Sequence, residues 1–220
     1  MTTHPVSPVQ SPFIPWPEGQ KLVLASRSPR RAELLATAGI PFEVVLPHEE
    51  SEAAAARELD PAADPARYAE VLAAAKAHDV AGRLPGRLVL GSDTVVVLDG
   101  AVLEKPADEA DARRLLGLLA DRRHTVITSV ALVGGYAGAS GVVEHEATEV
   151  GFLPLTPGAI DRYVATGEPM DKAGAYGIQG YGALMVREVD GCYFNVMGLP
   201  LARLGAMMRA ILGGTPGSKG

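Results

Sequence analysis

Residues 26–31, with the sequence Ser-Arg-Ser-Pro-Arg-Arg, combine side chains and backbone geometry suited to binding an anion. They follow the apolar run 22–25, so we expect a strand, a tight turn and a helix with Ser28 as its N-cap and Pro29 at its first position. Free backbone N–H groups and the positive end of the helix dipole would meet there. Because guanidinium groups match phosphate oxygens, the segment indicates a phosphate site. A capped helix whose arginines face water is the alternative.

Asp93 is a second candidate, because its carboxylate interrupts the apolar strand expected over residues 88–98. A buried charge without a partner is unfavourable, so a lysine, a divalent cation or a catalytic water would have to accompany it. Lys105 ends the strand that returns from the expected hairpin turn at 99–100, which would bring an ammonium group near Asp93. Lys76 lies in an alanine-rich helix, where a lysine more often extends to water. The alternative for Asp93 is a hydrogen bond within a bulge or to a neighbouring turn.

A glycine-rich loop over residues 167–182 is the third candidate. Its glycines allow close backbone approach, and Gln179 offers both an amide donor and an acceptor that suit the edge of a nucleobase. The alternative is a flexible surface loop. The sequence has no Walker-type loop and no Gly-x-Gly-x-x-Gly motif after a strand. It therefore lacks the commonest sequence motifs of nucleoside triphosphatases and of dinucleotide-binding proteins.

The composition indicates a globular domain, or a domain with two lobes, in a chain of 220 residues. A formal net charge of −6 argues against a nucleic-acid surface. No apolar run approaches the roughly 20 residues that span a membrane. The single cysteine, Cys192, excludes an intramolecular disulfide and indicates a reducing cytoplasm; we expect it to be a small apolar residue in a strand.

The order of the elements predicts an α/β domain over residues 21–212, with a mixed rather than purely parallel sheet. We expect a disordered or loosely docked proline-rich extension over residues 1–20 and a flexible tail over 213–220. Strands are expected over residues 22–25, 42–46, 88–98, 101–105, 125–133, 142–152, 184–189 and 193–196. Helices are expected from 29 onward and over residues 64–80, 108–120, 156–165 and 199–212.

In this order along the chain, the candidate segments resemble the Maf family of nucleoside triphosphate pyrophosphatases. The resemblance covers residues 21–205 and departs from the family at Asp121 and Glu104, where glycine is usual. The segments that carry it are 24–31, 33–35, 73–77, 92–94, 105–106, 171–180, 195–196 and 198–200.

The resemblance implies a mixed central sheet flanked by helices, in two lobes around a cleft (Maf/ITPase-like), and a homodimer. It implies hydrolysis of the α–β bond of a nucleoside triphosphate, with Mg²⁺ or Mn²⁺, to the monophosphate and pyrophosphate. Residues 176–180, Tyr-Gly-Ile-Gln-Gly, resemble the branch that acts on dTTP and UTP. The alternatives are a pyrophosphatase of the same fold for 7-methyl-GTP and a nucleotide-binding regulator of cell division.

The resemblance also implies roles for individual residues. It makes Asp93 the proton acceptor or a metal-linked carboxylate, and it ties Arg30, Thr94 and Gln179 to substrate choice. Lys76 and Lys105 would offset charge on the leaving pyrophosphate. The expected phosphate ligands are Ser26, Ser28, Arg30 and Arg31, and the expected metal ligands are Asp93 and Glu50, with Glu49 or Glu52 as alternatives to Glu50.

Overall fold

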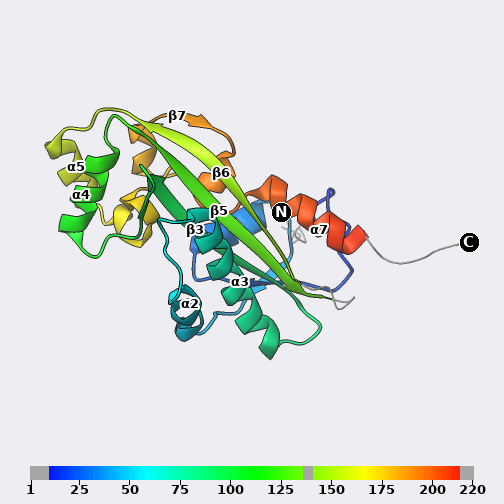
Figure 1. The fold of residues 1–220 in the computed structure, drawn as a ribbon. Coiled ribbons are helices and arrows are strands. Elements are labelled where there is room, and N and C mark those ends of the chain that lie inside the picture. The colour runs from blue at the N-terminus through cyan, green and yellow to red at the C-terminus, as the bar shows by residue number, and fades with distance from the viewer. Residues whose placement is uncertain (1–9, 136–140, 214–220) are drawn as a thin grey trace, which may run out of the picture.

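Three long antiparallel strands form the centre of the protein, whose computed structural model describes residues 10–135 and 141–213 (Figure 1). They belong to a seven-stranded sheet in the order β2-β1-β3-β5-β6-β7, in which β4 also pairs with β3. β1 pairs in parallel with β2 and β3, and every other pair is antiparallel, which confirms the mixed sheet. The strands are β1 (Leu22–Ala25), β2 (Phe42–Val44), β3 (Leu88–Leu98), β4 (Ala101–Leu103), β5 (Arg123–Gly134), β6 (Val142–Phe152) and β7 (Val186–Asp190).

The helices cover both faces of this sheet, and capping side chains mark the start of some of them. The side chains of Asp64, Asp108 and Thr156 each accept a backbone N–H of the first helical turn. None of the helices in the described residues is long and apolar enough to cross a membrane. The helices are α1 (Pro29–Thr37), α2 (Glu49–Ala56), α3 (Pro65–Arg83), α4 (Glu109–Leu119), α5 (Pro157–Val164), α6 (Tyr193–Met197) and α7 (Leu201–Gly213), with 3-10 turns η1 (Glu168–Asp171), η2 (Ala173–Ala175) and η3 (Tyr181–Met185).

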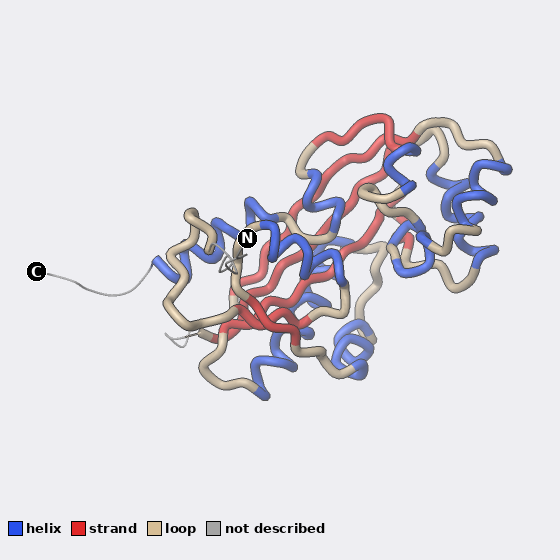
Figure 2. The backbone as a smooth tube through the Cα atoms, turned by 180° about the vertical axis from the view of Figure 1, so that it is seen from behind, coloured by secondary structure: helices blue, strands red, loops and turns tan. Residues whose placement is uncertain are grey.

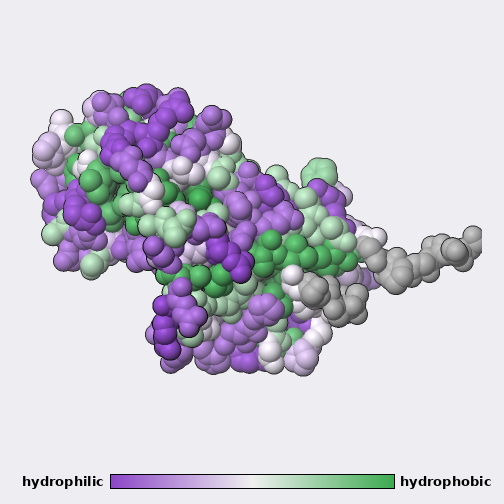
Figure 3. All heavy atoms as spheres, viewed as in Figure 1, coloured by the Kyte–Doolittle hydropathy of each residue, from purple (hydrophilic) through white to green (hydrophobic). Residues whose placement is uncertain are grey.

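Two lobes share the long strands (Figure 2). In the first lobe, α1 and α7 cover one face of the sheet and α3 the other, because alternate residues of β1 point to opposite faces. In the second lobe, α4, α5 and the 3-10 turns pack around Phe152 and Tyr176. Figure 3 shows hydrophilic residues over much of one face, with hydrophobic residues gathered between the lobes and toward α7.

The hairpin turn predicted at Asp99-Gly100 is confirmed. Both residues have positive φ, of 51° and 80°, and they join Leu98 to Ala101, which pair across the hairpin. Asp121, at a position where glycine is usual in the resembling family, also has a positive φ, of 57°. Aspartate tolerates this backbone conformation better than most residues, so the departure leaves the local turn intact.

The strand predicted over residues 193–196 is wrong, because these residues form the short helix α6. A run as short as Tyr-Phe-Asn-Val does not distinguish a strand from a helical turn. Asn195 anchors the turn to the sheet through hydrogen bonds to the Thr128 N–H (3.1 Å) and the Val126 carbonyl (2.9 Å). Cys192 is correspondingly not in a strand, and it is the half-buried N-cap residue of α6.

Residues 10–20, part of the extension expected to be disordered or loosely docked, pack against the first lobe. Ile14 is buried in the cluster beneath α1 and α7, and Trp16 packs against it. Ser11 N–H donates to the Gly39 carbonyl at 2.8 Å. Residues 1–9 and 214–220 lie outside the described residues, whereas Gly213, expected in the tail, ends α7.

Close packing of α3 on β3 depends on Gly91. A Cβ atom at this position would lie 2.1 Å from the Ala73 carbonyl oxygen and 2.9 Å from the Ala77 backbone nitrogen. Only glycine allows the helix to approach so near.

We therefore expect Gly91→Ala to lower the free energy of unfolding by about 1–3 kcal/mol or more, because the helix must move away. Gly82→Ala, on the exposed end of the same helix with nothing within 4 Å of the added Cβ, should stabilise the protein by about 0.5–1 kcal/mol. Urea denaturation followed by circular dichroism measures both changes. A Gly91→Ala protein as stable as wild type would contradict the packing argument.

His124 is a buried titratable group in the core of the second lobe. Its Nε2 lies 2.8 Å from the Tyr176 hydroxyl, and its ring meets the edge of Phe152 with centroids 5.0 Å apart. Its Nδ1 has no partner among the described atoms. Burial lowers the pKa of His124 from 6.5 to about 4, so the folded protein holds the imidazole neutral at pH 7.

This lowered pKa predicts acid sensitivity. Between pH 6.5 and about 4 the unfolded chain binds a proton that the folded chain does not. Above pH 6.5 the imidazole is neutral in both states and does not lower the free energy of unfolding. As the pH falls toward 4, the free energy of unfolding decreases by about 3 kcal/mol in total because of His124. His124→Gln should flatten this part of the stability profile in urea titrations at a series of pH values. Exposed His78→Gln is the control, and equal profiles for His124→Gln and wild type would rule out the assignment.

Candidate active site

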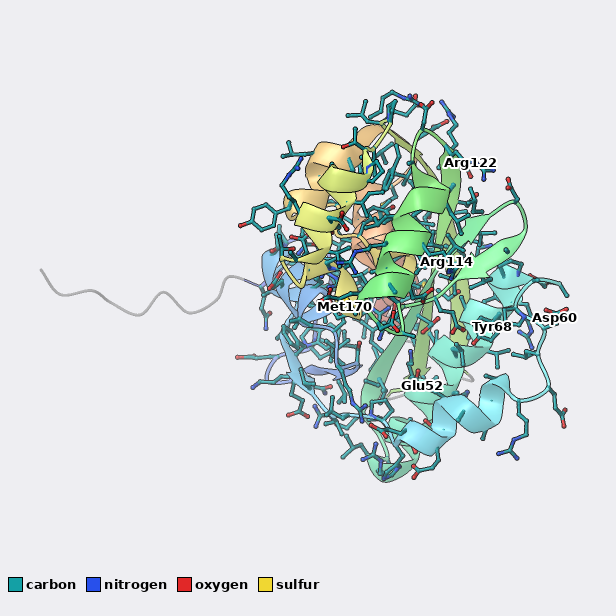
Figure 4. The ribbon with its side chains drawn as sticks, turned by 90° about the vertical axis from the view of Figure 1, so that its left-hand side faces the viewer. Glu52, Asp60, Tyr68, Arg114, Arg122 and Met170 are labelled. Carbon is teal, nitrogen blue, oxygen red and sulfur yellow. The ribbon has the colours of Figure 1, made fainter. Side chains whose placement is uncertain are left out.

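A cavity of about 600 Å³ lies between the lobes. Its walls come from the β1–α1 turn, α2, the middle of β3 and the segment 171–179 that carries η2. Figure 4 shows Glu52 of α2 on one side of this region and Met170 of η1 on the other lobe.

All but one of the site residues predicted from the sequence line this cavity. The exception is Glu50, on the exposed surface of α2. The predicted residues that line it are Ser26, Ser28, Arg30, Arg31, Lys76, Asp93, Thr94, Lys105 and Gln179.

Asp93 lies in the middle of β3 with Lys76 as its partner. The Lys76 ammonium, on α3, is 2.6 Å from Asp93 Oδ1, 3.0 Å from Glu52 Oε2 and 3.4 Å from the Ser92 carbonyl. Lys76 is buried, so the usual extension of a lysine to water does not apply here. The hydrogen-bonded ammonium supplies the partner that a partly buried carboxylate requires.

Glu52, rather than Glu50, faces the cavity because of the helical spacing of α2. Residues at positions i, i+3 and i+4 share one face of a helix, and Glu49, Glu52 and Ala53 stand on the face that lines the cavity. Glu50 falls off this face. The alanine-rich sequence of these residues does not itself predict a helix, so helical spacing could not distinguish the three glutamates from sequence.

Arg31 ties the wall of the cavity together from a buried position. Its guanidinium donates to the Gly198 carbonyl (2.9 Å), Ser26 Oγ (3.0 Å) and Thr94 Oγ1 (3.1 Å). Burial lowers the pKa of Arg31, and nearby Asp93 opposes the shift. Ser26, Arg31 and Thr94, expected as separate ligands, therefore form one hydrogen-bonded unit that joins the β1–α1 turn, α1 and β3.

Arg30 reaches across the cavity to the other lobe. Its Nη1 is 2.9 Å from Asp171 Oδ2, and Asp171 also accepts from the Lys172 ammonium at 2.5 Å. Burial alone would raise the pKa of the Asp171 carboxyl. The hydrogen bonds from Lys172 and Arg30 outweigh burial and hold this pKa below its ordinary value. A phosphate that binds Arg30 must compete with this carboxylate.

Ser28 begins α1 as predicted, with extended backbone angles and Pro29 at the first helical position. Its side chain makes no capping hydrogen bond within the described part of the chain. Its own N–H instead donates to Ser26 Oγ at 3.2 Å. The two serines and the first turn of α1 thus border the cavity.

The cavity wall also contains Glu49, an alternative metal ligand in the sequence analysis, Arg27 of the segment 26–31, and Lys172 and Tyr176 of the glycine-rich loop. Arg27 and Glu49 form an exposed pair at 2.7 Å, and Tyr176 contributes a buried aromatic wall. Lys172 and Tyr176 lie within the quoted segment 171–180, so their position there was the available signal.

Four carboxylates line the cavity, and those of Asp93 and Glu52 lie close together because both contact Lys76 Nζ. No group of three or more His, Cys, Asp or Glu side chains in the described residues could hold an ion. The pair nevertheless fits Mg²⁺, which takes one or two carboxylates and completes its shell with water and phosphate oxygens.

Two bacterial proteins resemble this chain in sequence over most of its length. The dTTP/UTP pyrophosphatase of Symbiobacterium thermophilum is 51% identical over 189 residues, 86% of this chain and 93% of that protein. The protein of the same name from Moorella thermoacetica is 53% identical over 193 residues, 88% of this chain and 95% of that protein.

Among solved structures, the Ham1 protein of Staphylococcus aureus superposes with a TM-score of 0.48 at 15% identity, over 87% of this chain and all of that one (100%). A likeness this weak carries no functional argument. The profile of the family described as "Maf-like protein" matches residues 21–211, which include every residue of the cavity wall. The chain therefore belongs to the Maf-like protein family.

Proposed function

We propose that this protein hydrolyses the α–β phosphate bond of dTTP and UTP and releases the nucleoside monophosphate and pyrophosphate. The observation that carries the proposal is the placement of Asp93, held by Lys76, between the helix N-terminus at Ser28 and the loop that presents Gln179. The names of relatives about half identical to this chain support the choice of nucleotides.

The charge of the cavity wall suits a triphosphate. Its six cationic and four anionic side chains give a balance of +2, in a chain whose formal charge is −6. Positioning and charge neutralisation supply most of the catalysis in phosphoryl transfer. The cations are Arg27, Arg30, Arg31, Lys76, Lys105 and Lys172, and the anions are Glu49, Glu52, Asp93 and Asp171.

Asp93 is the proposed proton acceptor. Lys76 holds its Oδ1, which leaves Oδ2 to take a proton from the water that attacks the α-phosphorus. Ser26, Ser28 and Arg30 border the space for the phosphate oxygens, and Lys105 would neutralise charge on the departing pyrophosphate. Arg31 and Thr94 hold this arrangement from behind.

We propose Mg²⁺ or Mn²⁺ as the cofactor, held by Asp93 and Glu52. When bound, the cation would neutralise phosphate charge and acidify a water ligand. In this proposal Glu52 takes the place of Glu50, because Glu52 faces the cavity. Lys76 must then share both carboxylates with the ion.

We also propose that the protein acts in the cytoplasm as a homodimer. The family resemblance supports the dimer, and the presence of one cysteine, Cys192, is typical of a reducing compartment. The negative net charge fits a small anionic substrate bound in a local basic cavity rather than a nucleic acid.

Wild-type protein with Mg²⁺ or Mn²⁺ should release pyrophosphate from dTTP and UTP, and excess chelator should stop the reaction. Asp93→Asn keeps the size of the side chain but not the proton acceptor, so kcat should fall by about 10²- to 10⁴-fold. Nucleotide binding, measured by calorimetry, should remain. Pyrophosphate release from a panel of nucleoside triphosphates is the assay.

Asp99→Asn is the matched control, since Asp99 lies at the exposed hairpin turn and asparagine tolerates its positive φ. Unchanged turnover in Asp93→Asn would exclude Asp93 as the base. Binding without turnover across the whole panel in wild type would instead favour a nucleotide-binding regulator, and turnover of 7-methyl-GTP alone would favour the other pyrophosphatase branch.

Gln179→Glu should change the preferred base. The substitution replaces an amide donor by a carboxylate that only accepts hydrogen bonds, so kcat/KM for dTTP should fall by roughly tenfold or more relative to a purine nucleotide. Gln20→Glu adds the same charge away from the cavity wall and should leave the preference as it is. An identical ratio of dTTP to dGTP turnover in Gln179→Glu and wild type would remove Gln179 from base recognition.

A further inference from the structure

We propose that Glu168 and Tyr163 are positioning residues that hold the segment 177–182, and with it Gln179, at the base-recognising end of the cavity. This inference rests on the proposed function. Neither residue lines the cavity. They act through the backbone on either side of Gln179.

The Glu168 carboxylate holds the C-terminal side of the segment by hydrogen bonds. Its Oε2 accepts the Tyr181 N–H at 2.9 Å, and its Oε1 accepts the Gly182 N–H at 3.1 Å. The Tyr163 hydroxyl donates to the same Oε1 at 2.8 Å. Hydrogen bonds to an ionised carboxylate are stronger than those between neutral groups, so these contacts restrain the backbone directly after Gln179.

Tyr163 closes the segment on its N-terminal side. Its hydroxyl oxygen accepts the Gly177 N–H at 3.0 Å while its proton goes to Glu168. One hydroxyl therefore connects the residues before Gln179 to those after it. Burial raises the pKa of Tyr163 well above its ordinary value, which keeps the hydroxyl protonated as this arrangement requires.

The side chains of Glu168 and Tyr163 approach the backbone of the segment at its glycines. A Cβ on Gly180 would lie 2.3 Å from Glu168 Oε2, and one on Gly177 would lie 3.1 Å from Oε1. A Cβ on Gly182 would lie 3.0 Å from the Tyr163 hydroxyl. The backbone wraps around the carboxylate, so the glycines serve close approach rather than flexibility.

The main chain of Glu168 is also held by hydrogen bonds, which fixes the position from which its carboxylate extends. Lys172 Nζ donates to the Glu168 carbonyl at 2.6 Å, and the Glu168 N–H donates to Thr166 Oγ1 at 3.2 Å. Tyr163 is buried in α5 among the core of the second lobe. The rigid core of this lobe thus fixes the loop through two side chains.

Glu168→Gln is the sharpest test, because it keeps the shape but places an amide donor against backbone N–H donors. We expect about a tenfold or larger rise in KM for dTTP, kcat within about threefold of wild type, and a roughly tenfold loss of preference for dTTP over dGTP. Tyr163→Phe should act in the same direction. The double variant should be little worse than the worse single variant, because both act through one network.

A purely structural role would lower kcat by the same factor for both nucleotides and leave KM unchanged, and that result would overturn the proposal. Wild-type KM and preference in Glu168→Gln would overturn it as well. Exposed Glu109→Gln, which changes only a surface pair with Arg113, is the control. Should Glu168→Gln fail to fold, Tyr163→Phe provides the same measurements.

Amide hydrogen exchange separates this proposal from the proposed function. In both variants the amides of Gly177, Tyr181 and Gly182 should exchange about tenfold or more faster than in wild type, whether or not the protein turns over dTTP. Faster exchange in the variants, together with no pyrophosphatase activity in wild type, would mean that the restraint is correct and the proposed reaction is not. Unchanged exchange would overturn the restraint itself.

Discussion

The ammonium group of Lys76, shared between the carboxylates of Asp93 and Glu52, is the interaction around which the rest of the site is arranged. It requires α3 to lie directly on β3, and Gly91 permits that approach at the turn of α3 from Ala73 to Ala77, which contains Lys76. A larger residue at 91 would separate the helix from the strand and leave Asp93 without its partner. The packing of the first lobe and the chemistry of the cavity therefore depend on the same contact.

The two ends of the cavity are built by different lobes in different ways. At the end suited to phosphate, Arg31 forms three hydrogen bonds, to the β1–α1 turn, to β3 and to the Gly198 carbonyl. Arg30, the residue before it, lines the cavity. At the other end, Glu168 and Tyr163 hold the loop from behind. In both places a side chain away from the proposed substrate contacts orients the ones that would make them.

Much of this arrangement could be predicted from local sequence. Ser28 and Pro29 mark the start of α1, and the charge of Asp93 within an apolar strand demands the partner that Lys76 provides. The features that could not be predicted depend on contacts between residues far apart in the sequence. The segment after Cys192 forms a helix, in which Asn195 hydrogen-bonds to β5. Residues 10–20 pack on the first lobe because Ile14 is buried beneath α1 and α7. The choice of Glu52 over Glu50 required the phase of a helix that alanine-rich sequence alone did not reveal.

The long strands have a consequence for how the protein melts. β3 and β5 pair continuously from Leu88 with Gly134 to Val97 with Thr125, and β5 and β6 from Arg123 with Gly151 to Leu132 with Val142, so both ladders run through both lobes. Neither lobe can lose its sheet without unravelling that of the other, and we expect a single cooperative transition rather than sequential loss of two subdomains. A nucleotide bound between the lobes would then raise the melting temperature of the whole chain, by mass action on one folding equilibrium.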